Sequence, residues 1–276
     1  MDGMIVVGVD GLRPGLLAVE WAAREAVVRE VPLRLVSVVP AWCLEDGPTG
    51  AIAEIGAWMR KGGETALLEA AAAAMRAAGK VAVETALVGG DPRQELIEAS
   101  AEADLLVVGD SGMGTLRGLL IGSVALGVAG HAHCDVVVVR ASAAAPDAEV
   151  VVGVDGSAAQ ADVLDFAFRE AAARGADLRA VLAWSWRDLL GGGPEASRQA
   201  LAKALAEGRE RHPDVHPSME IVEGSPVDVL RQAAAGAGLL VVGSRGRGLL
   251  TGMILGSVSQ ALLHVAPCPV VVVRAR

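Results

Sequence analysis

The chain has no tyrosine, two phenylalanines and three lysines among its 276 residues. Aromatic residues make up 3% of the sequence, which argues against the base-stacking surfaces that single-stranded nucleic acids need. The 24 basic residues are outnumbered by 33 acidic ones, so the net charge is -9. Nucleic acids and anionic membranes bind basic surfaces. We therefore expect neither of them as a partner.

Cysteine is also scarce, because only Cys43, Cys134 and Cys268 are present and none has the CxxC spacing of a metal site. No apolar stretch reaches the roughly 20 residues of a membrane helix. Two acidic residues within the first ten argue against a signal peptide. The hydrophobic fraction of 53% excludes wholesale disorder. These features predict a soluble, cytoplasmic chain with a large core.

The sequence contains an internal repeat. Residues 5–11 recur as residues 150–156 at an offset of 145, and residues 105–109 recur as residues 239–243 at an offset of 134. Between residues 103–141 and 237–275, 21 of 39 positions are identical, which chance does not produce. The sequence therefore predicts two homologous domains, 1–141 and 149–276, joined by a linker rich in small residues.

Each half alternates strand-like and helix-like segments. Apolar runs predict strands in the first half at 4–9, 33–39, 81–88, 104–108 and 135–139. Helical spacing or capping residues predict helices at 16–28, 51–78, from Asp91-Pro92 onward, and at 122–132. Runs such as Val270–Val273 lack polar alternation, which indicates parallel strands buried on both faces. We predict two tandem Rossmann-like, doubly wound α/β domains, each with a mostly parallel five-stranded sheet.

A glycine-rich loop follows the fourth strand of each half. It reads Gly109-x2-Gly112-x9-Gly122-Ser123 in the first and Gly243-x2-Gly246-x9-Gly256-Ser257 in the second. Glycine allows a ligand to approach the backbone closely, and a helix that begins at Gly-Ser presents N–H groups suited to phosphate. The alternative is a tight turn without a ligand. Two copies with the same spacing favour a ligand-binding loop.

Other phosphate and catalytic motifs do not fit. The one Gly-Lys pair, Gly79-Lys80, is followed by Val81, so a P-loop is excluded. The dinucleotide fingerprint GxGxxG lacks its third glycine in both halves, and the loop follows the fourth strand instead of the first. A GxSxG nucleophile motif fails as well, because Gly109-Asp110-Ser111-Gly112 is followed by Met113. Arg245 stands in the second half where Ser111 stands in the first, which also argues against a serine nucleophile.

Asp10 and Asp155 end the first strand of each half. In a doubly wound sheet this strand is central, and ligands bind beyond the carboxyl ends of the strands. A carboxylate there can accept a hydrogen bond from a base amino group or a ribose hydroxyl. The alternative is that each aspartate caps the following helix, and both roles are compatible.

These motifs, together with the closing Cys268-Pro269 and the valines up to Arg274, resemble the universal stress protein family in its tandem, ATP-binding form. The resemblance covers essentially the whole chain. It implies strand order 3-2-1-4-5 and ATP bound between the first and fourth strands. It also implies that domains pair through their last strands, here within one chain as a pseudo-dimer, with a further homodimer as an option.

The resemblance also implies site residues. It assigns Asp10 and Asp155 to the adenine side, with Val38 and Ala183 reading the base through their backbones. It assigns ribose and phosphate binding to Gly109, Gly112, Gly122, Ser123, Val124, Gly243, Arg245, Gly246, Gly256, Ser257, Val258 and Ser259. The first half departs at Asp110-Ser111, where the second has the more usual Ser244-Arg245. That departure affects the predicted affinity of the first site and leaves its fold unchanged.

Several conspicuous residues are given structural roles. Cys134 and Cys268 are equivalent, and we interpret them as small packing residues. His131 and His133 are expected at the surface or at a helix end. Tryptophans near the variable region after the second strand are expected in core or interface packing, with covering of a base as the alternative; they are Trp42, Trp58, Trp184 and Trp186.

The favoured function is a nucleotide-dependent stress or regulatory protein with two ATP sites, read out through conformation or a protein partner. One alternative is a slow ATPase or nucleotidyl-transfer enzyme, with Mg²⁺ as a possible companion of ATP. Another is an interaction module without nucleotide. No base recurs at a position aimed at the γ-phosphate, so no catalytic residue is named and binding is preferred over catalysis.

Overall fold

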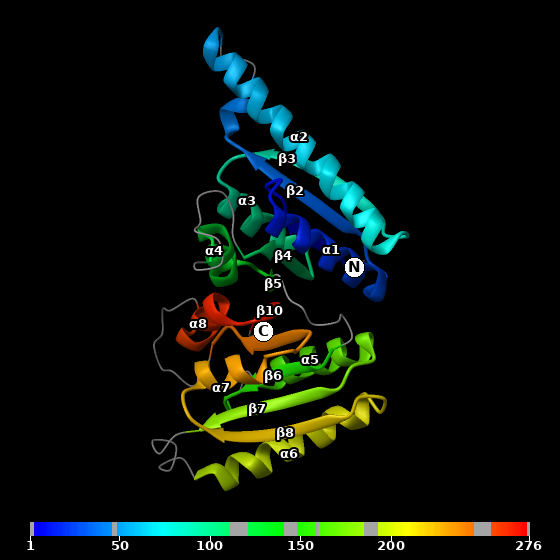
Figure 1. Cartoon of the computed structure of the whole chain (residues 1–276), viewed down its shortest axis with the longest axis vertical. Helices are drawn as coiled ribbons and strands as arrows, with labels where there is room; N and C mark the ends of the chain where they lie inside the picture. The colour runs from blue at the N-terminus through cyan, green and yellow to red at the C-terminus, as the bar shows by residue number, and fades with distance from the viewer. Residues whose placement is uncertain are drawn as a thin grey trace. The chain divides into compact units, whose positions relative to one another are not determined.

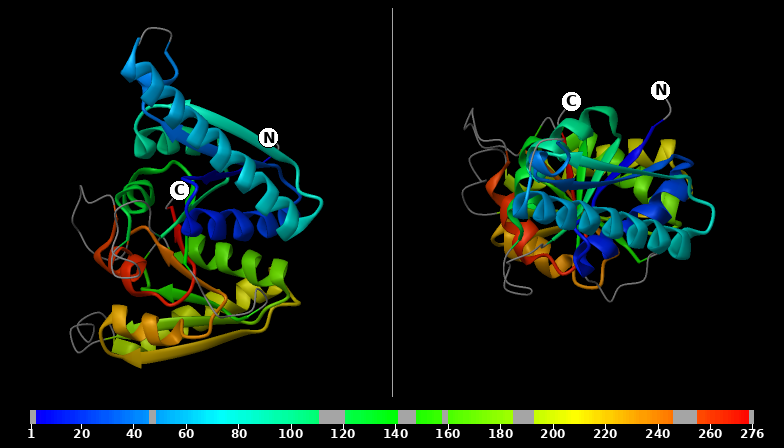
Figure 2. Two further views of the ribbon diagram at one scale, coloured as in Figure 1. Left: turned by 45° about the horizontal axis from the view of Figure 1, so that its top comes forward. Right: turned by 90° about the horizontal axis from the view of Figure 1, so that it is seen from above.

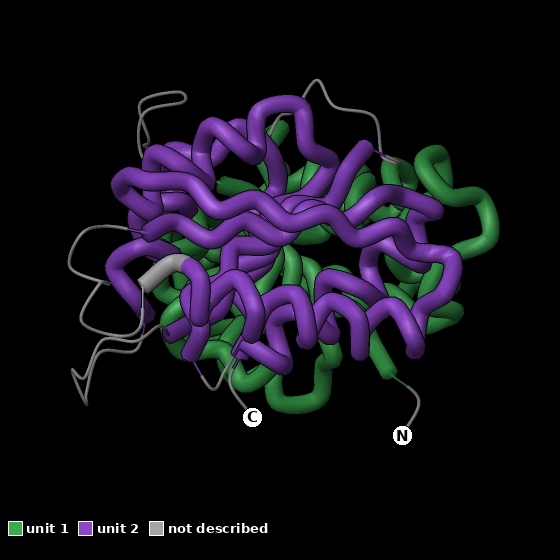
Figure 3. The backbone as a smooth tube through the Cα atoms, turned by 90° about the horizontal axis from the view of Figure 1, so that it is seen from below, with its two compact units in different colours: residues 1–140 green, residues 141–276 purple. Residues whose placement is uncertain are grey.

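A computed structural model describes residues 3–45, 49–110, 121–140, 148–157, 160–184, 193–245 and 255–274. The chain separates into two compact units, Met1–Arg140 and Ala141–Arg276, coloured separately in Figure 3. The predicted linker falls mostly outside the described residues. Each unit is described below by itself.

The first unit alternates strands and helices along the chain, as Figure 1 shows. Its strands are β1 (Ile5–Gly8), β2 (Leu33–Val39), β3 (Val83–Gly89), β4 (Leu105–Gly109) and β5 (Asp135–Val139). Its helices are α1 (Arg13–Arg29), η1 (Ala41–Cys43), α2 (Ala51–Ala78), α3 (Pro92–Ala99), η2 (Ser100–Glu102) and α4 (Ser123–His131). The predicted strands and helices are all present, with ends displaced by at most three residues.

The second unit repeats this order. Its strands are β6 (Val150–Val154), β7 (Leu178–Trp184), β8 (Pro217–Glu223), β9 (Leu239–Gly243) and β10 (Val270–Val273). Its helices are α5 (Gln160–Arg174), α6 (Gly193–Arg211), α7 (Pro226–Ala233) and α8 (Ser257–Val265). Helix α6 has 19 residues and its counterpart α2 has 28. Most of the length difference between the halves therefore lies in this helix.

The strands of each unit are parallel. Their order is β3-β2-β1-β4-β5 in the first unit and β8-β7-β6-β9-β10 in the second. Equivalent pairs keep the same register, because Ile5 lies opposite Leu33 and, 145 residues on, Val150 lies opposite Leu178. The doubly wound α/β fold is confirmed in both halves.

Helices cover both faces of each sheet. In the first unit α1 packs beside α2, and α3 beside α4; in the second α5 packs beside α6, and α7 beside α8 (Figures 1 and 2). Strands whose sequences do not alternate between apolar and polar residues, such as β4, are buried between these helical layers. The outer strand β3 is largely half-exposed or exposed and accordingly carries Glu84 and Thr85. Burial on both faces explains the valine-rich, unalternating sequence of the inner strands.

The predicted start of α3 is confirmed in detail. Asp91 is its N-cap, and its carboxylate accepts hydrogen bonds from the backbone N–H groups of Arg93 and Gln94. Pro92 occupies the first turn, where its missing N–H costs no helical hydrogen bond. The cap and the proline together set the point where the chain leaves β3 and begins the helix.

The cysteine prediction is confirmed, and the structure excludes core packing for one of the tryptophans. All three cysteines are buried and none forms a disulfide. Trp58 is 76% exposed on α2, so it does not pack in the core of its unit. It lies in the first turns of α2, and α2 is longer than its counterpart α6. None of the helices within the described ranges is long and apolar enough to cross a membrane.

Candidate functional site

The central strand of each unit marks the switch point of the sheet. β1 lies between β2 and β4, and β6 lies between β7 and β9. From the central strand the chain passes to the two strands on one side of it. It then crosses over to the fourth strand, on the other side. Ligands of doubly wound sheets bind beyond the carboxyl ends of the strands at this point. The predicted aspartates and glycine loops all follow these strand ends.

Asp10 and Asp155 occupy the same local structure. Asp10 Oδ1 accepts the backbone N–H of Leu12 at 3.0 Å, and Asp155 Oδ1 accepts that of Ser157 at 2.8 Å. The intervening Gly11 has φ +75°, which favours glycine; its counterpart in the second unit has φ +72°. The N-cap of α1 is Leu12, so Asp10 holds the turn before the helix and does not cap its first amides.

Asp10 is exposed, yet neighbouring protein removes water from part of its carboxylate. This partial burial raises the pKa of Asp10 above its usual range, while hydrogen bonds from the backbone of Leu12 and of Asp10 itself oppose the shift. An added N–H or O–H donor would favour the charged form and offset the lost hydration. A ligand with an amino group or hydroxyl supplies such a donor.

Close packing requires glycine at position 109, which could not be predicted from the sequence. A Cβ built on Gly109 would lie 2.6 Å from the backbone carbonyl carbon of Pro14 and 2.9 Å from the backbone nitrogen of Gly15. The first turn of α1 therefore lies directly against the end of β4. In the second unit a Cβ on Gly243 would lie 3.1 Å from the carbonyl oxygen of Arg245. The glycine requirement is thus stricter in the first unit.

This difference predicts unequal costs for the same substitution. Gly109→Ala should destabilise the chain by about 1–3 kcal/mol, because backbone on both sides of the clash must shift. Gly243→Ala should cost no more than about 1 kcal/mol, because Ala also lowers the entropy of the unfolded chain. Thermal or denaturant unfolding of the two variants checks the order. Equal costs would contradict the close approach of α1 to β4.

The base of each glycine loop is closed by one backbone hydrogen bond. The N–H of Gly122 donates to the carbonyl of Asp110 at 2.7 Å, and the N–H of Gly256 donates to the carbonyl of Ser244 at 2.8 Å. The loop therefore leaves the strand and enters the next helix at neighbouring points. Gly112 and Gly246 lie outside the described residues, so their predicted role stays a prediction.

The helices that follow these loops begin without a side-chain cap. Gly122 is the N-cap of α4 and Gly256 that of α8, with nearly identical backbone angles of φ -66°. Glycine has no side chain to accept the first N–H groups of a helix, which carry partial positive charge. Ser123 and Ser257 open the two helices and are exposed, while Val124 and Val258 follow half-buried. The first turn thus offers amides and a hydroxyl to an anion.

Ser259, which the resemblance assigns to ligand binding, also makes a contact within its own unit. It is 5% exposed, and its hydroxyl donates to the carbonyl oxygen of Gly243 at 2.6 Å. That contact ties α8 to the end of β9. The first unit has the buried Ala125 at this position and makes no equivalent bond. The predicted role of Ser259 in ligand binding stays a prediction.

Val38 and Ala183 are confirmed as equivalent positions. Val38 lies opposite Val88 in the β2–β3 pair, and Ala183 lies opposite Val222 in the β7–β8 pair. The two strand pairs therefore have equivalent residues in register. The carbonyl of Val36 accepts the N–H of Val9, so Val36 faces β1. Alternate residues of a strand face the same neighbour, so the N–H and C=O of Val38 also point to the β1 side. They do so beyond the last register pair of β1, which is Gly8 with Val36.

An arginine that the sequence motifs did not predict lies beside the start of the first loop. Arg140 directly follows β5, and its Nε lies 3.3 Å from a carboxylate oxygen of Asp110. The departure at Asp110 therefore comes with a positively charged neighbour. The signal was present in the sequence, because Arg274 recurs at the equivalent position after β10.

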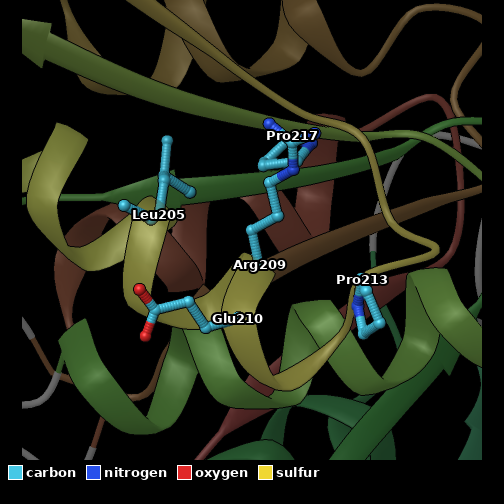
Figure 4. A pocket seen from close by; sticks show the side chains of 6 residues that line it. Leu205, Arg209, Glu210, Pro213 and Pro217 are labelled. Atoms are coloured by element: carbon cyan, nitrogen blue, oxygen red, sulfur yellow. The ribbon is translucent and has the colours of Figure 1, made fainter.

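Other features of the described surface do not join this site. Figure 4 shows a shallow groove between the end of α6 and the start of β8, lined by Leu205, Ala206, Arg209, Glu210, Pro213 and Pro217. It lies at the amino end of β8, away from the strand ends that bind ligands in such sheets. Within the described ranges, no three His, Cys, Asp or Glu side chains are grouped as a metal would require.

The chain therefore joins two domains of one α/β class. Each has an aspartate at the end of its central strand and, after a glycine loop, a helix without a side-chain cap. The model of the universal stress protein family matches residues 3–140 and 148–274. The chain belongs to the universal stress protein family and carries its domain twice.

Relatives match this chain over nearly the full length of both proteins. A universal stress protein of Mycobacterium tuberculosis is 39% identical over 286 residues, which cover 98% of this chain and 96% of that one. One from Mycolicibacterium smegmatis is 37% identical, with coverage of 99% and 97%. The crystal structure of a universal stress protein from Archaeoglobus fulgidus covers all of both chains with a TM-score of 0.77 at 21% identity, which supports the fold.

Proposed function

We propose that this chain is an ATP-binding regulatory protein of the universal stress family, with one nucleotide site in each unit. The observation that carries the proposal is the recurrence of one local arrangement. In both units an aspartate turn ends the central strand, and a closed glycine loop leads from the neighbouring strand into a helix without a side-chain cap. The same arrangement is present in both units, as expected if both bind the same kind of ligand.

The adenosine end would lie over the central strand. The exposed carboxylate of Asp10 suits the ribose or base as an acceptor, and the backbone of Val38 offers an N–H and a C=O to the adenine edge. Asp155 and Ala183 are the counterparts in the second unit. This division of roles rests on the geometry of the aspartate turns, on the direction in which the backbone of Val38 points, and on the family resemblance.

The phosphate end would lie at the helix that follows the loop. The first amides of α4 and α8 and the hydroxyls of Ser123 and Ser257 suit negative charge, because helix N-termini carry partial positive charge. Gly109 and Gly243 hold the strand end beneath the loop, and Gly112 and Gly246 belong to the loop itself. Arg245, exposed after β9, adds a positive charge in the second unit. Mg²⁺ would enter with the phosphates of ATP.

The proposal is tested by identifying what the protein carries. Native mass spectrometry of the intact chain as purified, followed by calorimetric titration with ATP, should reveal adenine nucleotide at two sites. Hydrolysis is a separate question, and single-turnover measurements with and without Mg²⁺ distinguish binding from slow ATPase activity. A chain that neither carries nor binds adenine nucleotide would refute the proposal in favour of an interaction module.

The last strands support a further expectation about assembly. β5 and β10 end their strand orders and consist mainly of valine, so each would expose an apolar edge if its unit stood alone. We propose that the two units pair through these edges as a pseudo-dimer within the chain. Residues 1–140 and 148–276 expressed separately should then dimerise or aggregate in sedimentation experiments. Two monomeric, well-behaved halves would contradict the pairing.

A further inference from the structure

Helix α2 has an apolar outward face. The helix belongs to the outer layer of the first unit and lies over β2 and β3 (Figure 1). Its inward face is buried and consists of glycine, alanine and Leu67. Large apolar side chains also lie on the outward face, where Trp58 is 76% exposed, Leu68 69% and Met75 50%. In the described part of the chain, no other helix or strand has as many exposed large apolar residues.

These side chains belong to one regular stripe, which we call the α2 stripe. Its exposed residues recur at alternating spacings of three and four, like the core positions of a coiled coil; they are Trp58, Lys61, Thr65, Leu68, Ala72 and Met75. The hydroxyl of Thr65 donates to the carbonyl of Lys61 at 2.8 Å, so it needs no partner outside the helix. Lysine can lay its aliphatic stem on an apolar neighbour while its ammonium stays in water. The stripe is therefore a nearly continuous apolar seam, about 27 Å long.

The second unit shows that the fold does not require this stripe. Helix α6 takes the place of α2, and its buried Leu201 and Gly208 stand 134 residues after the buried Leu67 and Ala74. The equivalents of the stripe residues from 61 to 75 are all exposed; they are Glu195, Gln199, Ala202, Ala206 and Arg209. None of them is a large apolar residue. An apolar stripe on only one of two equivalent helices indicates a contact that α2 makes and α6 does not.

We propose that the α2 stripe is a homodimer interface, in which α2 packs antiparallel against α2 of a second copy of this chain. Trp58, which does not pack in the core of its unit, then has the interface role that was expected for the tryptophans. A two-fold axis between residues 66 and 67 forms three layers, each present twice: Trp58 with Met75 of the partner subunit, Lys61 with the partner's Ala72, and Thr65 with the partner's Leu68. These layers join an aromatic ring with a thioether and larger side chains with smaller ones, which favours close packing.

The charges beside the stripe favour this partner and this orientation. Antiparallel packing about that axis brings Lys61 close to the partner's Glu69, and Glu54 close to the partner's Arg76; these residues are exposed. Parallel packing would instead bring Lys61 against the partner's Lys61. Within its own helix Lys61 has only an exposed contact with Glu64 at 3.8 Å, which contributes little. Complementary charges of this kind fix orientation and register more than affinity.

The experiment is sedimentation of the full chain between about 1 and 100 μM, without nucleotide. The short stripe places this interface at the small end of specific interfaces, so we expect a reversible dimer with a Kd on the order of 10 μM. Leu68→Glu puts a charge beside the two-fold axis twice in each dimer, and it should weaken association about 100-fold or more. Ala202→Glu, at the equivalent position of α6, is the matched control and should leave association unchanged. Both positions are exposed, so thermal unfolding of both variants should resemble that of the unmodified chain.

Disulfide trapping of the full chain tests the orientation. The three native cysteines are buried, so they do not compete. Lys61→Cys combined with Ala72→Cys should give a covalent dimer when oxidised glutathione is added, because residue 61 faces residue 72. Lys61→Cys alone should give none, since the two copies of residue 61 would lie about 16 Å apart along the helices, which is beyond the reach of a disulfide.

Two results of the sedimentation experiment would overturn the proposal. One is a chain that remains monomeric at about 100 μM, and the other is a dimer that Leu68→Glu weakens no more than Ala202→Glu does. Efficient trapping of Lys61→Cys alone would overturn the antiparallel arrangement. None of these measurements involves nucleotide, so the proposed function stands or fails independently of them.

Discussion

A Gly256→Val variant is expected to lose nucleotide binding in the second unit while the fold stays intact. Gly256 has φ -66° and ψ 147°, a conformation open to any residue, so the substitution does not strain the backbone. Its N–H, which bonds the carbonyl of Ser244, is retained. The added side chain would crowd the first amides of α8, where phosphates are proposed to bind. Affinity should fall about 100-fold or more, which is roughly 2.7 kcal/mol.

Calorimetry with ATP measures this loss, and circular dichroism with thermal unfolding checks the fold. Gly122→Val is the matched variant, because Gly122 caps α4 with almost the same backbone angles. It should remove the binding event of the first unit and spare that of the second. Unchanged ATP affinity in a folded Gly256→Val protein would show that phosphate does not bind at this helix.

The second large effect concerns the inequality of the two sites. Asp155→Ala is expected to remove the tighter ATP-binding event, and Asp10→Ala the weaker one. The second loop carries Arg245 and Arg247, where the first carries Ser111 and Met113. Each added positive charge within ~6 Å of a phosphate contributes on the order of 1 kcal/mol after screening. Together with the exchange of Asp110 for Ser244, this separates the affinities by about tenfold or more.

Titration of ATP into the two single variants, with and without Mg²⁺, identifies which event each removes. Mg²⁺ neutralises part of the phosphate charge, so it should narrow the difference between the sites. If Asp10→Ala removes the tighter event, the charges around the loops do not control affinity. Arg247, Ser111 and Met113 lie outside the described residues, so the argument for them rests on sequence alone.

The sequence predicted the fold well because the inner strands follow simple physical rules. β2, α2 and β5 begin and end at the predicted residues, since each is bounded by a change in hydrophobic pattern or by a glycine or proline nearby. α1 begins three residues before its predicted start. Its first turn contains Pro14, which is compatible with a helix start but adds nothing to the apolar spacing from which the helix was predicted. The repeat supplied an independent comparison for every element of the second unit.

The candidate site was predictable as a set of positions and less so as a set of roles. The strand ends and the glycine spacing located Asp10, Gly122 and their counterparts. The sequence could not predict contacts between distant elements, such as that of Gly109 with Pro14. Such contacts give some glycines a packing role. The Asp110–Arg140 pair was missed for the same reason, since its members are 30 residues apart on neighbouring strands.

The most direct test of the central claim is native mass spectrometry of four full-length proteins mixed with excess ATP. These are the unmodified chain, Asp10→Ala, Asp155→Ala and the double variant. The account predicts two bound nucleotides on the unmodified chain, one on each single variant and none on the double variant. Absence of ATP from the unmodified chain, or two nucleotides on the double variant, would contradict it.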